Sequence, residues 1–213
     1  MALKGKRIYI TYGRFQPVTW GHENSFNVIK KRASENGCPY RIFVSHSHNN
    51  NTDPLKQDVK IKWMKIMLGE HANNIMGINP SNPQKCVRYC MKKVNGVIPE
   101  DYDECVYMVG SDRVSDFQWV KRSNGNTAKD GTRYYFTTVE VRSTGERDAD
   151  GDDKKDKKAT GGFAISGTKL RVYASLGDKK NFTKGMPSGT SDKLVTELYD
   201  EVRANLPFGY AGK

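Results

Sequence analysis

The sequence has few cysteines, no long apolar run and no dense basic block. Its four cysteines among 213 residues are too sparse for a disulfide scaffold. No apolar stretch approaches the roughly 20 residues that a membrane-spanning helix needs. The N-terminus runs directly into a strand-like pattern, which is not typical of a signal peptide. These absences predict a soluble, cytoplasmic protein with no membrane partner.

Positive charge is distributed unevenly along the chain. The sequence holds 35 Lys and Arg against 24 Asp and Glu, a net charge of +11. Residues 1–100 carry 16 basic and 6 acidic side chains, so +10 of the excess lies there. Such an excess favours an anionic partner. Because nucleic-acid-binding tails are usually dense basic blocks, nucleic acid is not expected to be that partner.

Strand and helix patterns alternate along the chain. Short β-branched and aromatic runs predict strands at 7–12, 40–45, 75–78, 105–109 and 133–141. Apolar residues at helical spacing predict helices at 21–35, 55–68, 83–95, 166–176 and 191–206. This alternation predicts one α/β domain over residues 1–213, with a mostly parallel sheet and helices on both faces. Residues 143–162 are rich in glycine and charge and are expected to form a flexible loop.

The first unusual segment, GRFQPVTWGH at residues 13–22, follows the first predicted strand. Gly13 would let a phosphate approach the backbone, and the amides that open the next helix favour an anion. Thr19 and His22 are three residues apart, so both can face one point and contact phosphate oxygens. The alternative is an ordinary strand–turn–helix with a capping threonine and a solvated histidine.

The second segment, ISGTKLR at residues 165–171, opens another predicted helix. Ser166 can cap this helix, Gly167 allows close approach of a ligand, and Thr168 adds a hydroxyl. Arg171 lies one turn further on, so the group could bind phosphate. The alternative is a capped helix with an exposed arginine.

The third segment, VGSDRVSDFQWVKR, covers residues 109–122. Asp112 could accept hydrogen bonds from ribose hydroxyls, and Trp119 could stack on an aromatic base. A tryptophan on an amphipathic helix is more often part of the core.

Two of these segments resemble the signatures of the nucleotidylyltransferase superfamily, T/HxGH at residues 19–22 and ISxTxxR at 165–171. The loop GRFQP and the segment 109–122 are similar to those of pyridine-nucleotide adenylyltransferases. The resemblance implies a Rossmann-like fold and transfer of AMP from ATP to a phosphorylated acceptor. It further implies nicotinamide mononucleotide as acceptor, NAD and pyrophosphate as products, and Mg²⁺ carried by the triphosphate.

The resemblance also implies roles for individual residues. His22 and Thr19 would hold the α- and β-phosphates, and Arg171 would hold the β- and γ-phosphates with Ser166 and Thr168. Further contacts with ATP would come from Gly13, Arg14, Phe15, Gly21, Gly110, Asp112 and Gly167. The acceptor would contact Lys56, Trp20 and Trp119, with Arg14 or Lys56 on its phosphate.

Departures from the family pattern leave other functions open. Thr19 at the first motif position also occurs in phosphopantetheine adenylyltransferases, and ISGT is similar to the motif of ATP sulfurylase. One alternative is a cytidylyltransferase that uses CTP and a phospho-alcohol. Another is a structural or assembly protein that retains the fold, and self-association as a homo-oligomer stays open.

The remaining polar residues suggest no further chemistry. His46 and His48 follow a predicted strand, and Cys86 and Cys90 are four apart on a predicted helix. Neither pair has the ligand set of a zinc site, so no metal site is expected. Lys60, Lys62 and Lys65 are expected on a solvated helix face, from which one of them could reach the phosphates.

Overall fold

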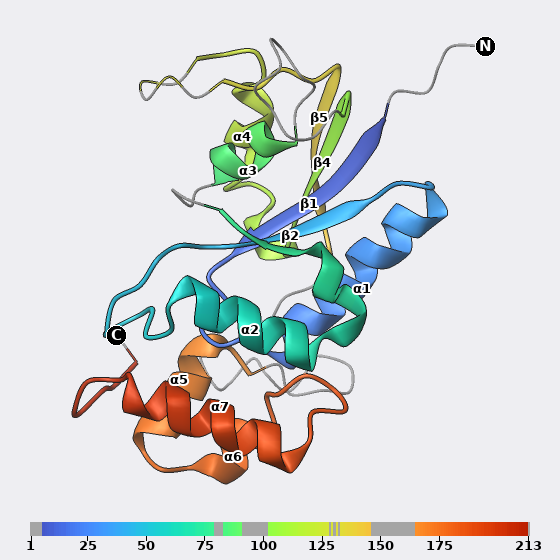
Figure 1. Cartoon of the computed structure of the whole chain (residues 1–213). Helices are drawn as coiled ribbons and strands as arrows, with labels where there is room; N and C mark the ends of the chain where they lie inside the picture. The colour runs from blue at the N-terminus through green and yellow to red at the C-terminus, as the bar shows by residue number, and fades with distance from the viewer. Residues whose placement is uncertain are drawn as a thin grey trace. The chain divides into compact units, whose positions relative to one another are not determined.

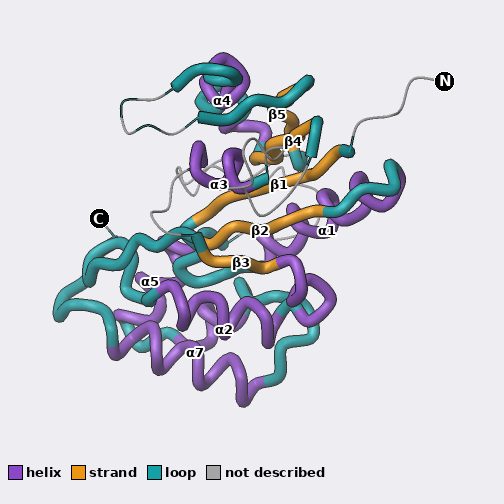
Figure 2. The backbone as a smooth tube through the Cα atoms, turned by 45° about the horizontal axis from the view of Figure 1, so that its top comes forward, coloured by secondary structure: helices purple, strands orange, loops and turns teal. Residues whose placement is uncertain are grey.

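A computed structural model describes residues 6–78, 83–90, 102–127, 129, 131, 133–145 and 165–212. Five strands form one sheet in the order β3-β2-β1-β4-β5, and β4 pairs in parallel with both β1 and β5. Figure 2 shows these strands side by side. Their bounds are β1 Arg7–Gly13, β2 Tyr40–Val44, β3 Ile75–Gly77, β4 Glu104–Val109 and β5 Thr138–Ser143. The prediction of a Rossmann-like α/β fold with a mostly parallel sheet is confirmed.

Internal contacts divide the chain into two compact units. The first unit comprises Met1–Gly13, Ser25–Phe43 and Ile78–Glu146. The second unit comprises Arg14–Asn24, Val44–Gly77 and Arg147–Lys213. The segments 13–22 and 165–171, which were predicted to bind phosphate, therefore both belong to the second unit, except that Gly13 belongs to the first. A single domain over residues 1–213 stays a prediction.

The first unit is built around β1, β4 and β5. Strand β4 is a continuous apolar run, and Cys105, Val106, Tyr107 and Met108 are at most 1% exposed. Such a run is typical of a strand that is covered on both faces. Helices α3 (Pro83–Tyr89) and α4 (Gln118–Arg122) lie on one side of these strands, and the Ser25–Glu35 part of α1 (Trp20–Glu35) lies on the other (Figures 1 and 2).

The second unit is mainly helical. Helix α2 (Gln57–Met67) is followed by the 3₁₀ helix η1 (Gly69–Asn74) and by β3. Helices α5 (Gly167–Ser175), α6 (Lys179–Thr183) and α7 (Asp192–Ala204) pack against one another (Figure 1). Each of these three helices begins with a side-chain cap, from Ser166, Asp178 and Ser191. Such caps satisfy amides that would otherwise lack a partner within the helix.

Several element boundaries differ from the sequence-based predictions. Strand β5 begins at Thr138 because Arg133 instead pairs with Thr127 in an isolated bridge, and Tyr134 and Phe136 are buried. The predicted helix 83–95 ends at Tyr89, and its last residues lie outside the described part of the chain. Helices α4 and α6 were not predicted, because five residues are too few to establish a period.

The predicted loop at 143–162 falls largely on residues outside the described part. Of its first residues, Ser143 ends β5, and the amide of Thr144 donates to the carbonyl of Val109 at 2.7 Å. Across the ranges that the structure describes, no helix has both the length and the apolar character needed to cross a membrane.

Leu170 and Leu176 offer a matched test of packing around α5. Leu170 is fully buried, whereas Leu176 is 74% exposed. We expect Leu170→Ala to lower the free energy of unfolding by about 3 kcal/mol, because it removes buried methyl groups and leaves a cavity. Leu176→Ala should change it by less than about 0.5 kcal/mol. Urea denaturation measures both, and equal losses would contradict the packing described for α5.

Candidate functional site

Thr19 and His22 are joined by hydrogen bonds at the start of α1. The amide of Thr19 donates to Nδ1 of His22 at 3.0 Å, and Thr19 Oγ1 lies 3.0 Å from the same nitrogen. Nδ1 can accept from an amide only through its lone pair, so the proton of the neutral ring sits on Nε2. The Phe15 ring meets the His22 ring edge-on, with 5.0 Å between centroids. His22 is therefore oriented as an Nε2–H donor.

Arg171 is buried and bonded to three separate groups. It is 5% exposed, so its guanidinium needs protein acceptors to offset the loss of water. Nη1 donates to the carbonyl of Gln16 at 2.7 Å, and Nη2 donates to Thr168 Oγ1 at 3.2 Å. Nε donates to the hydroxyl of Tyr210 at 2.8 Å. The alternative of an exposed arginine is wrong, and the bond to Gln16 joins the two motifs.

Gly167 lets α5 approach the loop of the first motif. A Cβ atom at this position would lie 3.0 Å from the Gln16 carbonyl oxygen and 3.3 Å from that of Pro17. Both neighbours are backbone atoms, which cannot turn away as a flexible side chain can. Ser166 caps the same helix by accepting from the amide of Lys169 at 3.2 Å. Gly167 thus permits a close approach of the Gln16–Pro17 backbone to the start of α5.

Gln16 is a site residue that sequence reasoning missed. It is 3% exposed, and its side-chain amide forms two bonds with the backbone of Leu55. Nε2 donates to the Leu55 carbonyl at 2.7 Å, and Oε1 accepts from the Leu55 amide at 2.9 Å. Gln16 therefore fixes the segment that leads into α2 and carries Lys56. Leu55 lies 39 residues after Gln16 in the chain, so no local pattern marks this contact.

Lys60 is buried, so its expected place on a solvated face is wrong. Lys60 lies on α2 and is 1% exposed, whereas Lys62 and Lys65 on the same helix are exposed as expected. Nζ donates to the carbonyl of Ser45 at 2.7 Å, to Ser45 Oγ at 3.1 Å and to the carbonyl of Ser47 at 3.2 Å. Loss of solvation on burial lowers the pKa of Lys60 to about 8.

Asp53 fixes the other end of the same loop. It is 3% exposed and accepts from Ser47 Oγ at 3.2 Å, Asn49 Nδ2 at 3.1 Å and Thr52 Oγ1 at 2.8 Å. Arg14 Nη1 lies 3.6 Å from Asp53 Oδ2, while the Arg14 side chain remains 60% exposed. Buried groups of opposite charge, Lys60 and Asp53, thus hold loop 45–53 in one shape, and Arg14 stays accessible from solvent.

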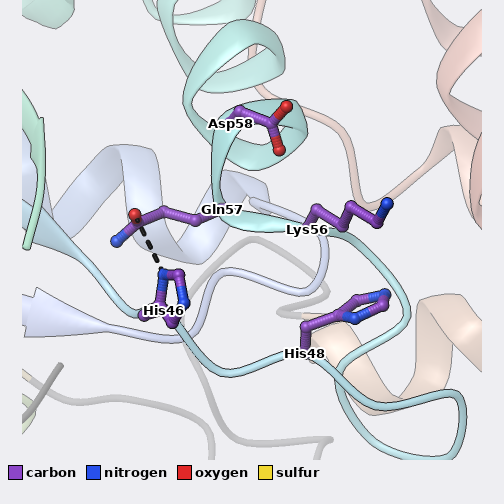
Figure 3. A pocket seen from close by; sticks show the side chains of 5 residues that line it. All are labelled: His46, His48, Lys56, Gln57 and Asp58. Carbon is purple, nitrogen blue, oxygen red and sulfur yellow. Dashed lines mark hydrogen bonds between the residues drawn. The ribbon is translucent and has the colours of Figure 1, made fainter. Parts of the chain in front are cut away.

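A pocket of about 350 Å³ lies between this loop and the start of α2. It is lined by His46, His48, Lys56, Gln57 and Asp58 (Figure 3). His46 Nδ1 is 3.4 Å from Gln57 Oε1, and the two side chains come from different segments, the chain after β2 and the start of α2 (Figure 3). Two imidazoles, an amide and an ammonium lie here beside the carboxylate of Asp58, so the pocket can bind a polar group. Lys56, predicted to contact the acceptor, belongs to this pocket.

Four of the residues predicted to contact ATP or the acceptor belong to the first unit. Gly13, which ends β1, lies in the first unit with Gly110, Asp112 and Trp119. Asp112 is exposed on the 3₁₀ helix η2 (Ser111–Arg113), and Trp119 is half-buried on α4. Their contacts with a nucleotide stay predictions.

Trp20 and Gly21 begin α1 in the second unit. The Trp20 amide donates to the carbonyl of Gly185 at 2.9 Å. A Cβ atom on Gly21 would lie 3.7 Å from Thr19 Oγ1, which is an ordinary contact. Contacts of Trp20 with an acceptor and of Gly21 with ATP also stay predictions.

Thiols and carboxylates of the described chain do not gather into a metal-binding group. Within those residues, no three or more His, Cys, Asp or Glu side chains are placed to hold an ion. Cys86 and Cys90 are both buried, and burial raises the pKa of the Cys86 thiol well above its usual value. These thiols pack in the first unit.

Comparisons with known proteins give only distant likenesses. No protein-family model matches the sequence, and no curated protein matches it. One similar solved structure is a provisionally assigned nicotinate-nucleotide adenylyltransferase from Vibrio parahaemolyticus, with 13% identity, 91% of this chain and 98% of that chain covered, and a TM-score of 0.47. Another is a macrolide-efflux protein from Streptococcus pneumoniae, with 15% identity, 84% of this chain and 54% of that chain covered, and a TM-score of 0.45. At such identities and TM-scores, neither likeness bears on activity.

Gly167 and Gly21 allow a matched test of the close approach between the motifs. We expect Gly167→Ala to lower the free energy of unfolding by about 1–2 kcal/mol, because the new Cβ meets backbone atoms. Gly21→Ala should be neutral or stabilising by up to about 1 kcal/mol, since alanine favours the helix. Thermal or urea unfolding distinguishes them. Equal stability of the two variants would show that the Gln16 carbonyl does not constrain position 167.

Burial of Lys60 predicts a pH dependence of stability. Between about pH 8 and the ordinary lysine value of 10.5, the folded protein has released the Lys60 proton and the unfolded chain keeps it. Unfolding then takes up a proton, so the free energy of unfolding should rise with pH, by about 2 kcal/mol across this window. Urea denaturation at several pH values should show this rise in wild type and in the exposed-site control Lys65→Met. If Lys60→Met retains the same slope, Lys60 is not its source.

Proposed function

We propose that this protein is a nucleotidylyltransferase that transfers AMP from ATP to a phosphorylated acceptor and releases pyrophosphate. The single observation that carries the proposal is the 2.7 Å bond from Arg171 Nη1 to the Gln16 carbonyl. This bond joins a histidine-bearing helix start and an arginine-bearing helix start within one unit. Two such groups, each suited to phosphate, are what a bound triphosphate would need.

The chemistry requires positioning and charge stabilisation rather than a covalent enzyme intermediate. An oxygen of the acceptor phosphate attacks the α-phosphorus of ATP. The bond from that phosphorus to the oxygen bridging toward the β-phosphate breaks, and pyrophosphate leaves with the electron pair. His22, held as an Nε2–H donor by Thr19, would stabilise negative charge on the transferring group. Arg171, with Thr168 and Ser166, would hold the β- and γ-phosphates.

The acceptor is proposed to bind beside the pocket at the start of α2. Lys56 lies there with two histidines, and Arg14 offers an accessible guanidinium nearby in the same unit. Nicotinamide mononucleotide is the acceptor proposed first, because the motif loop is similar to that of pyridine-nucleotide enzymes. Asp112 and Trp119 are the proposed contacts with the adenosine and the acceptor base, respectively.

Mg²⁺ is proposed to arrive with the triphosphate, whose charge it would neutralise. The described side chains include no group of three that could hold an ion.

Removal of His22 gives the direct test. We expect His22→Ala to lower kcat by about 10²–10³-fold, because a donor to the transferring phosphoryl group is lost. The measurement is pyrophosphate release with ATP or CTP against a panel of phosphorylated acceptors that includes nicotinamide mononucleotide. The exposed-site control Lys65→Ala should stay within about twofold of wild type.

Each outcome of this assay separates the candidate functions. Turnover with CTP and a phospho-alcohol, but not with ATP, would replace the adenylyl donor by a cytidylyl donor. No turnover with any pair, together with no binding of ATP in calorimetry, would refute the enzyme and favour a structural protein. Turnover that survives His22→Ala would refute the site assigned here. Thermal unfolding of each variant shows whether it is folded.

A further inference from the structure

We propose that Tyr210 is a positioning residue that holds Arg171 in place to bind a polyphosphate. The inference rests on the proposed function for the identity of its ligand. Tyr210 lies outside both motifs, 39 residues after Arg171 in the chain. Nothing in the sequence patterns marks it, and its assignment comes from contacts within the second unit.

The contact between Tyr210 and Arg171 is direct and buried. The tyrosine hydroxyl accepts from Arg171 Nε at 2.8 Å, and the guanidinium carbon lies 5.8 Å from the centre of the tyrosine ring. Tyr210 is 8% exposed and Arg171 is 5% exposed. A hydrogen bond from a charged donor in such surroundings is among the stronger kinds. The hydroxyl is therefore the part of Tyr210 that positions the guanidinium.

Tyr210 is itself fixed to the helix that carries Arg171. Ser175 Oγ on α5 donates to the carbonyl of Tyr210 at 3.0 Å, and the Tyr210 amide donates to the carbonyl of Pro207 at 3.2 Å. Two residues on, a Cβ atom at Gly212 would lie 2.9 Å from Val172 Cγ2, so the backbone there packs closely on α5. The hydroxyl is thus presented from a rigid turn rather than from a free tail.

The hydrogen bonds of Arg171 explain why its position matters. A guanidinium has five N–H groups, and within the described chain three are used by Tyr210, Gln16 and Thr168. The two that are left can donate to phosphate oxygens. Their direction is fixed only while the three protein bonds hold the plane of the group. Loss of the Tyr210 hydroxyl would leave Nε without its partner and the plane held by two bonds instead of three.

The test compares Tyr210→Phe with Tyr199→Phe. Both changes remove one hydroxyl from a buried tyrosine of the second unit, but Tyr199 packs on Phe182, whereas Tyr210 bonds to Arg171. Calorimetry on the full chain would measure affinity for ATP and for inorganic tripolyphosphate. We expect Tyr210→Phe to weaken both affinities about tenfold, which is the usual scale for a hydrogen bond to a charged group. Tyr199→Phe should leave them unchanged.

A double-mutant cycle shows whether Tyr210 acts through Arg171. In an Arg171→Met background, Tyr210→Phe should cause no further loss of affinity. A loss that persists there would overturn the inference, and so would equal affinities of Tyr210→Phe and Tyr199→Phe. If Arg171→Met does not fold, that second comparison decides alone.

The outcomes also separate this inference from the proposed function. Binding of ATP or tripolyphosphate that depends on Tyr210, without turnover on any acceptor, would refute the proposed reaction and support the positioning role. No binding of either anion by the wild-type protein would overturn the inference itself. In every case, equal thermal unfolding midpoints of the two Tyr→Phe variants show that stability is not the cause.

Discussion

The second unit depends on one buried cation and the backbone carbonyl that it meets. Arg171 reaches the carbonyl of Gln16, 155 residues earlier in the chain, and the absence of a side chain on Gly167 lets the start of α5 lie close to the same carbonyl. Burying a guanidinium is costly unless its N–H groups are paired, so the charge itself selects a folded arrangement in which they are. Any change in the loop at Gln16 or at the start of α5 therefore acts on both motifs.

A second pair of buried charges shapes the loop that leads to the pocket. Lys60 bonds to carbonyls at the beginning of loop 45–53, and Asp53 binds side chains that fold back from its middle. Gln16 then connects Leu55 to the first motif. Lys56 and Arg14 stay exposed because other residues take the structural bonds. In this unit, the buried side chains Lys60 and Asp53 hold the loop, and the exposed side chains Lys56 and Arg14 are accessible from solvent.

The sheet, most helices and the Ser166 cap could be predicted, because each leaves a local pattern of apolar spacing or a capping residue. Lys60 could not: its helical position resembles those of Lys62 and Lys65, and only carbonyls 13 and 15 residues earlier make its burial favourable. Tyr210 and Gln16 were missed for the same reason, since their partners are distant in sequence. The predicted strand 133–141 begins only at Thr138 in the structure. The aromatic residues Tyr134 and Phe136, which suggested its earlier start, are buried in the core without belonging to the strand.

The bond between Thr19 and Nδ1 of His22 has a consequence for how a nascent chain behaves. It joins residues only three apart, so it can form as soon as the first turn of α1 exists. The partner of Gln16 is synthesised some 155 residues later. A growing polypeptide can thus hold the imidazole of His22 in this orientation before the arginine that joins the two motifs has been synthesised.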